Sequence, residues 1–485
     1  MNPDKKTEKA RTTKHIPEEI ISETSHTVLI NGEQIGYTAT AGTIILKDEN
    51  GAPKASIFFT AYTKSDIMDM SNRPLTFSFN GGPGSSSAWL HLGLLGPRRV
   101  LLEENGRPLP PPFKLINNEY SLLDVTDVVF IDPVSTGYSR VVPGEKSKQF
   151  HGVEKDIESV GEFIRLYVTR SKRWSSPKFL IGESYGTTRA AGLAGHLQDQ
   201  HGMYLNGIML LSLILNFQCV SFNPGNDLPY ILFLPTYTAT AWYHKQLSEG
   251  LQKDLRETLK DAEEFAQGEY ATALIKGATL SEHERAQVIQ KLARYTGLSL
   301  KYVEQTNLRI NVFRFVKELL RDKRQTVGRL DSRFTGIDRD AAGESFEYDP
   351  SHTIVQGPFS AAINDYLRTE LKFESDLPYR LLTGKVQPWN YGKYRNRYVD
   401  LTESLRKAMT KNPFLRIFVG SGYYDLATPY FASRYTLNHL GIDISLRKNV
   451  SMSYYESGHM MYTDRPSLLQ LKGDLAHFIR SSIKN

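Results

Sequence analysis

Apolar residues recur with two different spacings along the chain, and these spacings predict where strands and helices lie. Several apolar runs have the length of a buried strand. They are Leu75–Phe79, Asp127–Ile131, Phe179–Ile181 and Gly207–Leu215. Apolar residues from Val153 to Val168 recur instead at steps of three and four, which predicts a helix. A helix rich in small residues is expected over Tyr185–His196. Alternating apolar strands and helices favour a mainly parallel sheet that is covered on both faces.

Two Asn-Gly pairs near the start of the chain predict β-hairpins. Asn31-Gly32 and Asn50-Gly51 each separate short runs that are rich in β-formers. Because both central residues of a type I′ turn need positive φ, Asn-Gly favours that turn. We therefore expect the sheet to begin with an antiparallel meander. The polar residues 1–22 before it are expected to form a flexible tail.

The chain changes character between residues 216 and 405. This stretch has little strand character and is rich in charged helical segments, such as Lys253–Ile275, Ser281–Tyr295 and Ile310–Arg321. Strands are expected again at Leu415–Val419 and Val450–Tyr455, followed by an amphipathic helix over Arg465–Ile483. The sequence thus predicts an α/β core built from residues 23–215 and 406–485. A mainly helical insertion, or cap, would lie over the carboxyl ends of its strands.

Composition narrows the class of protein without identifying it. Hydrophobic residues make up 40% and charged residues 23% of the chain, as in a soluble globular protein. Part of the net charge of +6 lies in residues 1–15 and the rest is scattered, so we expect no nucleic-acid partner. No apolar run is long enough for a membrane span. The single cysteine, Cys219, excludes an intrachain disulfide and is expected to be a buried thiol.

The cellular compartment and the oligomeric state are not fixed by the sequence. Residues 1–25 are polar and lack the apolar core of a signal peptide. Two interpretations stay open, a cytosolic protein and an exported (periplasmic or secreted) protein from which a leader has been removed.

The strongest local indication of chemistry is Gly182-Glu183-Ser184-Tyr185-Gly186. This G-x-S-x-G pentapeptide follows an expected strand and precedes an expected helix, which is the setting of a nucleophile elbow. Glycines on both sides leave room for a sharp turn. The amino terminus of the following helix favours negative charge. The pattern predicts that Ser184 is the nucleophile of a hydrolase.

A serine nucleophile needs a base, and the base needs an orienting carboxylate. In this architecture the three residues follow in the order Ser, Asp, His, each after a strand. Asp425 follows the expected strand Leu415–Val419, and His459 follows Val450–Tyr455. These positions predict a triad of Ser184, Asp425 and His459.

Acyl transfer also needs an oxyanion hole, usually two backbone N–H groups. One is expected from Tyr185, directly after the nucleophile. The other is expected from the loop Asn80-Gly81-Gly82-Pro83-Gly84, which follows an earlier strand. Three glycines in five residues let the backbone approach a carbonyl oxygen closely.

At this point the chain resembles the serine carboxypeptidases. The motifs that carry the resemblance are NGGPGSS at Asn80–Ser86, DPVSTGYS at Asp132–Ser139, GESYG at Gly182–Gly186, and the blocks around Asp425 and His459 (GHM). Missing disulfides and the segment Ala88–Val100 are more similar to the bacterial branch of that family.

The resemblance implies an α/β-hydrolase fold and the release of C-terminal residues from peptides with a free C-terminus. It implies the triad named above, with Gly82 and Tyr185 as oxyanion donors. It also implies that Asn80, the Gly81 N–H and Glu183 hold the terminal carboxylate of the substrate. The mechanism needs no metal and no cofactor.

One departure from the family affects this carboxylate site. In well-known members, the counterpart of Glu183 shares a proton with a second glutamate, but that position is Leu94 here. Without the partner, Glu183 loses one source of a raised pKa, so we expect activity that extends towards neutral pH. Arg98 or Arg99 follows directly and is a candidate for binding the carboxylate instead, with Arg98 preferred.

Two other functions fit the same residues. An esterase or acyltransferase would use the same triad. A binding protein on a hydrolase scaffold would have no need of an intact triad and oxyanion loop. Exopeptidase activity is the leading hypothesis.

Overall fold

A computed structural model describes residues 18–483 of the protein. Its centre is a ten-stranded sheet in the order β1-β2-β3-β7-β4-β9-β10-β13-β14, with β8 paired to β3. The strands are β1 (Ile21–Ile30), β2 (Glu33–Lys47), β3 (Pro53–Lys64), β4 (Leu75–Phe79), β7 (Asp127–Ile131), β8 (Arg140–Val141), β9 (Lys178–Glu183), β10 (Gly207–Leu211), β13 (Arg416–Gly422) and β14 (Val450–Tyr455). Strands β1, β2 and β3 pair antiparallel. The six strands that follow β3 in the sheet order are all parallel to one another; they are β7, β4, β9, β10, β13 and β14. This is the α/β-hydrolase fold that the sequence predicts.

Of the two expected hairpin turns, one is a type I′ turn and the other is not. Asn31 and Gly32 have φ of 52° and 81°, and they connect Ile30 directly to Glu33. In the second hairpin only Gly51 has positive φ, at 81°. There the Gly51 N–H donates to the Asp48 carbonyl at 2.9 Å, so the loop is longer than a two-residue turn.

The start of the chain differs slightly from the expected boundary. Strand β1 begins at Ile21, so residues 21 and 22 of the expected tail belong to the sheet. Residues 1–17 lie outside the described residues.

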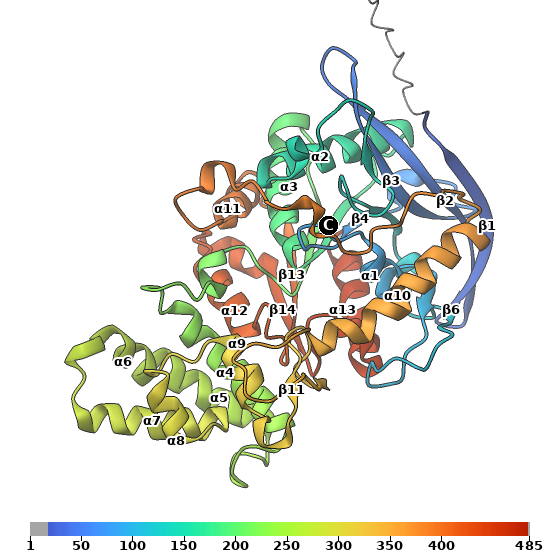
Figure 1. Cartoon of the computed structure of the whole chain (residues 1–485). Helices are drawn as coiled ribbons and strands as arrows, with labels where there is room; N and C mark the ends of the chain where they lie inside the picture. Colours follow the sequence, from blue (N-terminus) through green and yellow to red (C-terminus); the bar gives the residue numbers. More distant parts are fainter. Residues whose placement is uncertain (1–17, 484–485) are drawn as a thin grey trace, which may run out of the picture.

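Helices cover both faces of the sheet. The alternation along β7 shows the two sides, since Val128 and Phe130 lie in one apolar cluster while Val129 and Ile131 lie in another. One face packs against α2 (Val153–Arg170), α3 (Tyr185–His201) and α11 (Thr402–Lys411). The other packs against α1 (Ala88–Leu90), α10 (Pro350–Thr369) and α13 (Arg465–Ser481) (Figure 1). Burial on both faces explains why these strands are continuous apolar runs.

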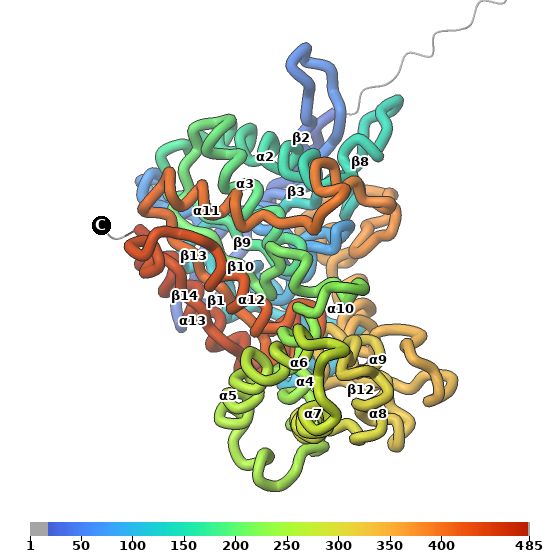
Figure 2. Tube along the Cα trace, turned by 90° about the vertical axis from the view of Figure 1, so that its left-hand side faces the viewer, coloured from blue at the N-terminus to red at the C-terminus, as the bar shows by residue number. Residues whose placement is uncertain are grey.

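The expected insertion divides into two parts by its packing. Helices α4 (Leu228–Tyr243), α5 (Leu255–Phe265), α6 (Ala271–Lys276), α7 (Glu282–Thr296), α8 (Leu300–Gln305) and α9 (Val312–Glu318) share a separate apolar cluster. Helices α5 to α8 gather at one end of the molecule in both views (Figures 1 and 2). Residues 350–401 return to the core, where Arg380 bridges Gly137 and Leu382 bridges Ser85. Within residues 18–483 we find no helix with the length and apolar character needed to cross a bilayer.

A buried polar cluster attaches α10 to the sheet. The Tyr62 hydroxyl lies 2.6 Å from His91 Nε2 and donates to the Tyr366 hydroxyl at 2.9 Å. Burial lowers the pKa of His91 from 6.5 to about 3. At mildly acidic pH, His91 is therefore neutral in the folded protein, whereas the same side chain is protonated in the unfolded chain.

This pKa shift predicts acid sensitivity. Between about pH 3 and 6.5 the unfolded chain binds the proton that folded His91 does not, so the free energy of unfolding falls as the pH falls. His91→Gln should lose less stability than the wild type on going from pH 7 to pH 4.5, by about 2–3 kcal/mol. Urea unfolding of both proteins at the two pH values measures this difference, and equal losses would contradict it.

Candidate active site

Ser184 lies in the sharp turn between β9 and α3. Its backbone has φ of 59° and ψ of −129°, a left-handed conformation that L-residues with side chains rarely adopt. The Ser184 N–H donates to the Leu211 carbonyl at 3.0 Å, which ties the turn to the end of β10. The sequence-predicted nucleophile elbow is therefore present, with the serine at its apex.

The flanking glycines are required because backbones meet here without space for side chains. A Cβ on Gly182 would overlap the backbone of Gly186, and one on Gly186 would lie 2.7 Å from the Phe79 carbonyl. A Cβ on Gly81 would overlap the backbone N of Tyr185. The loop after β4 and the turn at Ser184 thus touch backbone to backbone.

Asp425 and His459 meet as the sequence predicts. His459 Nδ1 lies 2.7 Å from Asp425 Oδ2, and both side chains are buried. The other oxygen of Asp425 accepts backbone N–H groups of Ala427 and Thr428 at 2.8 and 3.0 Å. Burial lowers the pKa of His459, but the Asp425 carboxylate outweighs burial, and the net shift is upward. This arrangement orients the ring and stabilises its protonated form.

Ser184 and His459 both line a cavity of about 740 Å³. Asn80, Gly81, Gly82 and Glu183 line it too, so it holds most of the predicted site residues. Within residues 18–483 no hydrogen bond joins the Ser184 side chain to His459. Such bonds are often long in an enzyme without substrate and close in the complex.

The two candidate oxyanion donors belong to adjoining backbone segments. Gly82 has φ of 105°, a conformation that favours glycine, and it lines the cavity. Tyr185 is the first residue of α3, so its N–H has no partner within the helix. Their positions are compatible with two N–H groups directed at one carbonyl oxygen.

A buried ion pair supports the loop that carries Asn80. Arg189, on α3, donates to Asp156 Oδ2 at 2.7 Å and to the Asn80 carbonyl at 2.6 Å. Both charged side chains are almost completely buried. Sequence reasoning missed this pair, because neither residue belongs to a motif and they come from different helices.

The DPVSTGYS motif forms a second support. Asp132 Oδ1 accepts the Ser87 N–H at 2.8 Å, directly after the loop at Asn80–Gly84. A Cβ on Gly137 would overlap the Asp132 carboxyl group, which explains the glycine. Burial raises the pKa of Asp132 to about 7. The motif therefore supports the segment after the Asn80–Gly84 loop, and within residues 18–483 none of its residues lines the cavity at Ser184.

Glu183 is buried beside the candidate nucleophile. Its Oε1 accepts Asn80 Nδ2 at 2.9 Å. Burial raises its pKa to about 7, although His459, Tyr462 and Asn80 each lower it. We expected the pKa to lose one source of elevation with Leu94 in place of a second carboxyl group. Burial is the largest source of that elevation, and the negative charge of Asp425 adds to it. Leu94 is itself completely buried.

Tyr462 is a site residue that sequence reasoning missed. Its ring lies over Gly93, where a Cβ would overlap it. Its buried hydroxyl interacts with the buried carboxyl group of Glu183 and lowers the pKa of that group. In the sequence, Gly93 is the one residue that reflects this contact. The need for a glycine there becomes clear only when Tyr462, far along the chain, is seen to pack on it.

The structure does not bring Arg98, a candidate for binding the substrate carboxylate, to the other predicted site residues. Its guanidinium group donates to Glu370 Oε1 at 2.8 Å and to Asn117 Oδ1 at 2.6 Å. It is not among the residues that line the cavity at Ser184. Arg98 instead connects β5 (Arg98–Val100) to the end of α10.

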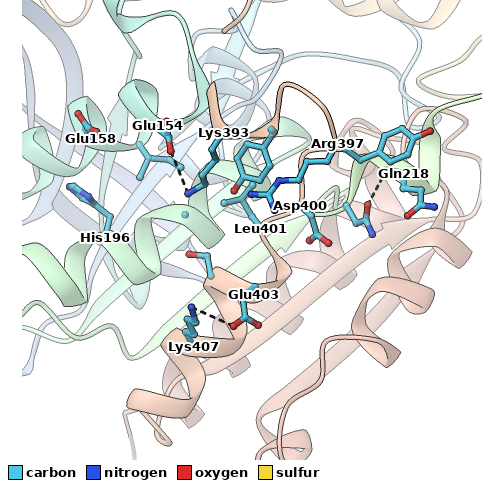
Figure 3. Close-up of a pocket in the computed structure, with 16 residues that line it drawn as sticks. Glu154, Glu158, His196, Gln218, Lys393, Arg397, Asp400, Leu401, Glu403 and Lys407 are labelled. Atoms are coloured by element: carbon cyan, nitrogen blue, oxygen red, sulfur yellow. Dashed lines mark hydrogen bonds and ion pairs between the residues drawn. The ribbon is translucent and has the colours of Figure 1, made fainter. Parts of the chain in front are cut away.

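A second cavity of about 810 Å³ lies between α2, α3 and α11 (Figure 3). It shares no lining residue with the cavity at Ser184. Two of its cations already have partners, since Lys393 pairs with Glu154 at 3.4 Å and Lys407 with Glu403 at 3.5 Å. We therefore assign the candidate active site to the cavity that holds Ser184 and His459.

A strand-turn-helix elbow followed by loops carrying Asp and His after later parallel strands defines the α/β-hydrolase class. A model of the family described as serine carboxypeptidase matches residues 34–471. The chain belongs to the serine carboxypeptidase family.

Sequence similarity to individual relatives is confined to part of the chain. It is 32% identical over 145 residues to pheromone-processing carboxypeptidase KEX1 of Saccharomyces cerevisiae, covering 28% of this chain and 19% of that protein. It is 29% identical over 164 residues to serine carboxypeptidase-like 33 of Arabidopsis thaliana, covering 33% and 32%. The match thus spans a fifth to a third of these relatives.

Structural similarity extends further. The crystal structure of Kex1(delta)p, a prohormone-processing carboxypeptidase from Saccharomyces cerevisiae, superposes with a TM-score of 0.57 at 18% identity. The superposition covers 92% of this chain and 91% of that one, so the two share a fold.

Gly81→Ala tests the backbone contact beneath Ser184. The new methyl group would overlap Tyr185 and Gly186, so we expect a loss of about 1–3 kcal/mol in unfolding free energy and a large loss of activity. Gly473→Ala, in α13 with open space around it, is the matched control and should be neutral or stabilising. Thermal unfolding of both variants makes the comparison. Equal stability of the two variants would contradict the contact.

Proposed function

We propose that the protein is a serine carboxypeptidase that hydrolyses the last peptide bond of substrates with a free C-terminus. The observation that carries this proposal is the buried pair of Asn80 and Glu183 in the same cavity as Ser184 and His459. Membership of the serine carboxypeptidase family supports it.

In the proposed mechanism His459 accepts the proton of Ser184 as Ser184 Oγ attacks the scissile carbonyl carbon. The backbone N–H groups of Gly82 and Tyr185 stabilise the resulting oxyanion. His459 then donates the proton to the leaving amine, and the C-terminal residue departs. Water, activated by His459, hydrolyses the acyl-enzyme. Asp425 holds the ring and stabilises the imidazolium at each step.

Recognition of the terminal carboxylate is assigned to Asn80, the Gly81 N–H and Glu183. An ionised Glu183 would repel the carboxylate of the substrate, whereas a protonated Glu183 donates a hydrogen bond to it. A pKa of about 7 keeps Glu183 largely protonated in mildly acidic solution. This is the property that separates an exopeptidase from an esterase with the same triad.

Ser184→Ala should lower the turnover of a blocked dipeptide on the order of 10⁶-fold, because the nucleophile is removed while the fold is kept. The blocked dipeptide, its amide and its ester are assayed with both proteins. The blocked dipeptide has a free C-terminal carboxylate, whereas its amide and its ester do not. Preferential release of a free amino acid from the substrate with the free C-terminus supports a carboxypeptidase. Preference for the ester with no peptide cleavage would support an esterase or acyltransferase, and wild-type turnover in the variant would reject Ser184.

Glu183 predicts a specific pH dependence. As the pH rises through about 7, Glu183 loses its proton and the preference for a free C-terminus should decline. The measured quantity is the ratio of kcat/KM for a blocked dipeptide to that for its amide, because the titration of His459 cancels in the ratio. In Glu183→Gln the ratio should be independent of pH. In Tyr462→Phe the decline should move to higher pH, since Tyr462 lowers the pKa of Glu183. A wild-type ratio that stays constant from pH 5 to 9 would exclude this role.

A further inference from the structure

We propose that Arg329 selects substrates whose C-terminal residue carries an acidic side chain. This inference rests on the proposed carboxypeptidase function and adds the class of substrate to it. Arg329 belongs to the cap segment after α9 and β11 (Thr326–Val327), outside every motif that the sequence offers.

The backbone around Arg329 is bonded to both loops that carry the acid and the base. The Leu426 N–H, next to Asp425, donates to the Arg329 carbonyl at 3.0 Å. The His459 N–H donates to the Leu330 carbonyl at 2.7 Å. The insertion therefore places this arginine beside the catalytic dyad. Burial lowers the pKa of His459, and the positive charge of Arg329 lowers it further, by a smaller amount.

The residues that follow fix the segment rigidly. Arg333 donates to Asp331 Oδ2 at 2.8 Å, to Asp464 Oδ1 at 2.9 Å and to the Ser457 hydroxyl at 3.0 Å. The Gly458 N–H donates to Asp331 Oδ2 at 3.1 Å. These buried bonds join the cap to the loop of His459, so Arg329 extends from a preorganised backbone.

Among the described residues that line the cavity at Ser184, Arg329 is the one lysine or arginine. Within residues 18–483 its guanidinium group takes part in no ion pair. Asp349, a carboxylate of the same cavity wall, is the cap of α10, where it accepts the N–H groups of Arg329, Leu330 and Ser351. A half-buried guanidinium group without a partner is a ready site for a carboxylate.

The carboxylate in question belongs to the leaving residue. His459 protonates the leaving amine in the proposed mechanism, so groups beside His459 surround the residue that departs. The α-carboxylate of that residue is already assigned to Asn80, Gly81 and Glu183. Arg329 therefore remains for its side chain.

The walls of the cavity fit a carboxylate on an aliphatic stem. Phe313 and Phe346 pack with ring centroids 5.9 Å apart, and Met460 lies on the same cavity. Apolar side chains can cover the two methylene groups of a glutamate while Arg329 binds its head. A C-terminal lysine would place its ammonium group against the same cation.

The first experiment needs no variant. Wild-type kcat/KM is measured for three blocked dipeptides with the same penultimate residue and a C-terminal Glu, Gln or Lys. A charge-assisted hydrogen bond predicts a preference for Glu over Gln of roughly tenfold to a hundredfold, with Lys slower than Gln. Equal values for Glu and Gln, or faster cleavage of Lys, would overturn the proposal.

The second experiment assigns the preference to Arg329. In Arg329→Gln the Glu-ending peptide should fall to the level of the Gln-ending one, while the Gln-ending peptide stays within about threefold of wild type. Arg329→Lys should keep part of the preference, since it keeps the charge and loses the planar fork. Arg324→Gln, which removes an exposed arginine of the same cap, is the matched control and should keep all of it.

The outcomes separate this inference from the proposed function. An equal fall for Glu- and Gln-ending peptides in Arg329→Gln would mean that Arg329 holds the α-carboxylate or the fold, and would overturn the inference alone. Cleavage of all three peptides without a Glu preference would do the same. If none of the three peptides is cleaved, both the inference and the carboxypeptidase function are rejected.

Discussion

Close contact between backbones beneath Ser184 is the constraint on which the rest of the site depends. Gly81, Gly182 and Gly186 meet where no Cβ has room, so the loop after β4 and the turn after β9 are fixed relative to each other. Strands β4 and β9 are parallel neighbours, and their carboxyl ends bring these segments to the same edge of the sheet. The strained backbone of Ser184 is stable because both sides of the turn are held in this way.

Buried ion pairs perform the same positioning at the periphery of the site. Arg189 with Asp156 supports the Asn80 loop, and Arg333 with Asp331 and Asp464 joins the cap to the loop of His459. Such pairs are weak evidence of net stability, because desolvation opposes their attraction. Their directional hydrogen bonds instead define one geometry. A catalytic site needs that geometry, since misplaced groups lose activity rapidly.

The spacing of apolar residues predicted the strands well, because strand formation depends largely on neighbouring residues in the sequence. Strands β4, β7 and β14 begin and end where their apolar runs do. The run Gly207–Leu215 was predicted as one strand, but β10 ends at Leu211 and the remaining apolar residues are buried outside the sheet. Arg98 was a candidate for the substrate because it follows the Leu94 position closely, and its ion pair with Glu370, 272 residues away in the sequence, could not be foreseen. Pairings at such separations leave no periodic trace.

The electrostatics of the cavity follow from burial as much as from the identity of its residues. Leu94 supplies no second carboxyl group, yet burial, with an addition from the charge of Asp425, raises the pKa of Glu183 to about 7. A protonated Glu183 adds no negative charge to the cavity. Asp349, on the same cavity wall, accepts backbone N–H groups, and within residues 18–483 it forms no ion pair with Arg329. Within residues 18–483, the cavity wall carries a protonated acid at Glu183 and, at Arg329, an arginine without an ion-pair partner. Two such groups are complementary to a residue with two carboxylates, one bound by each.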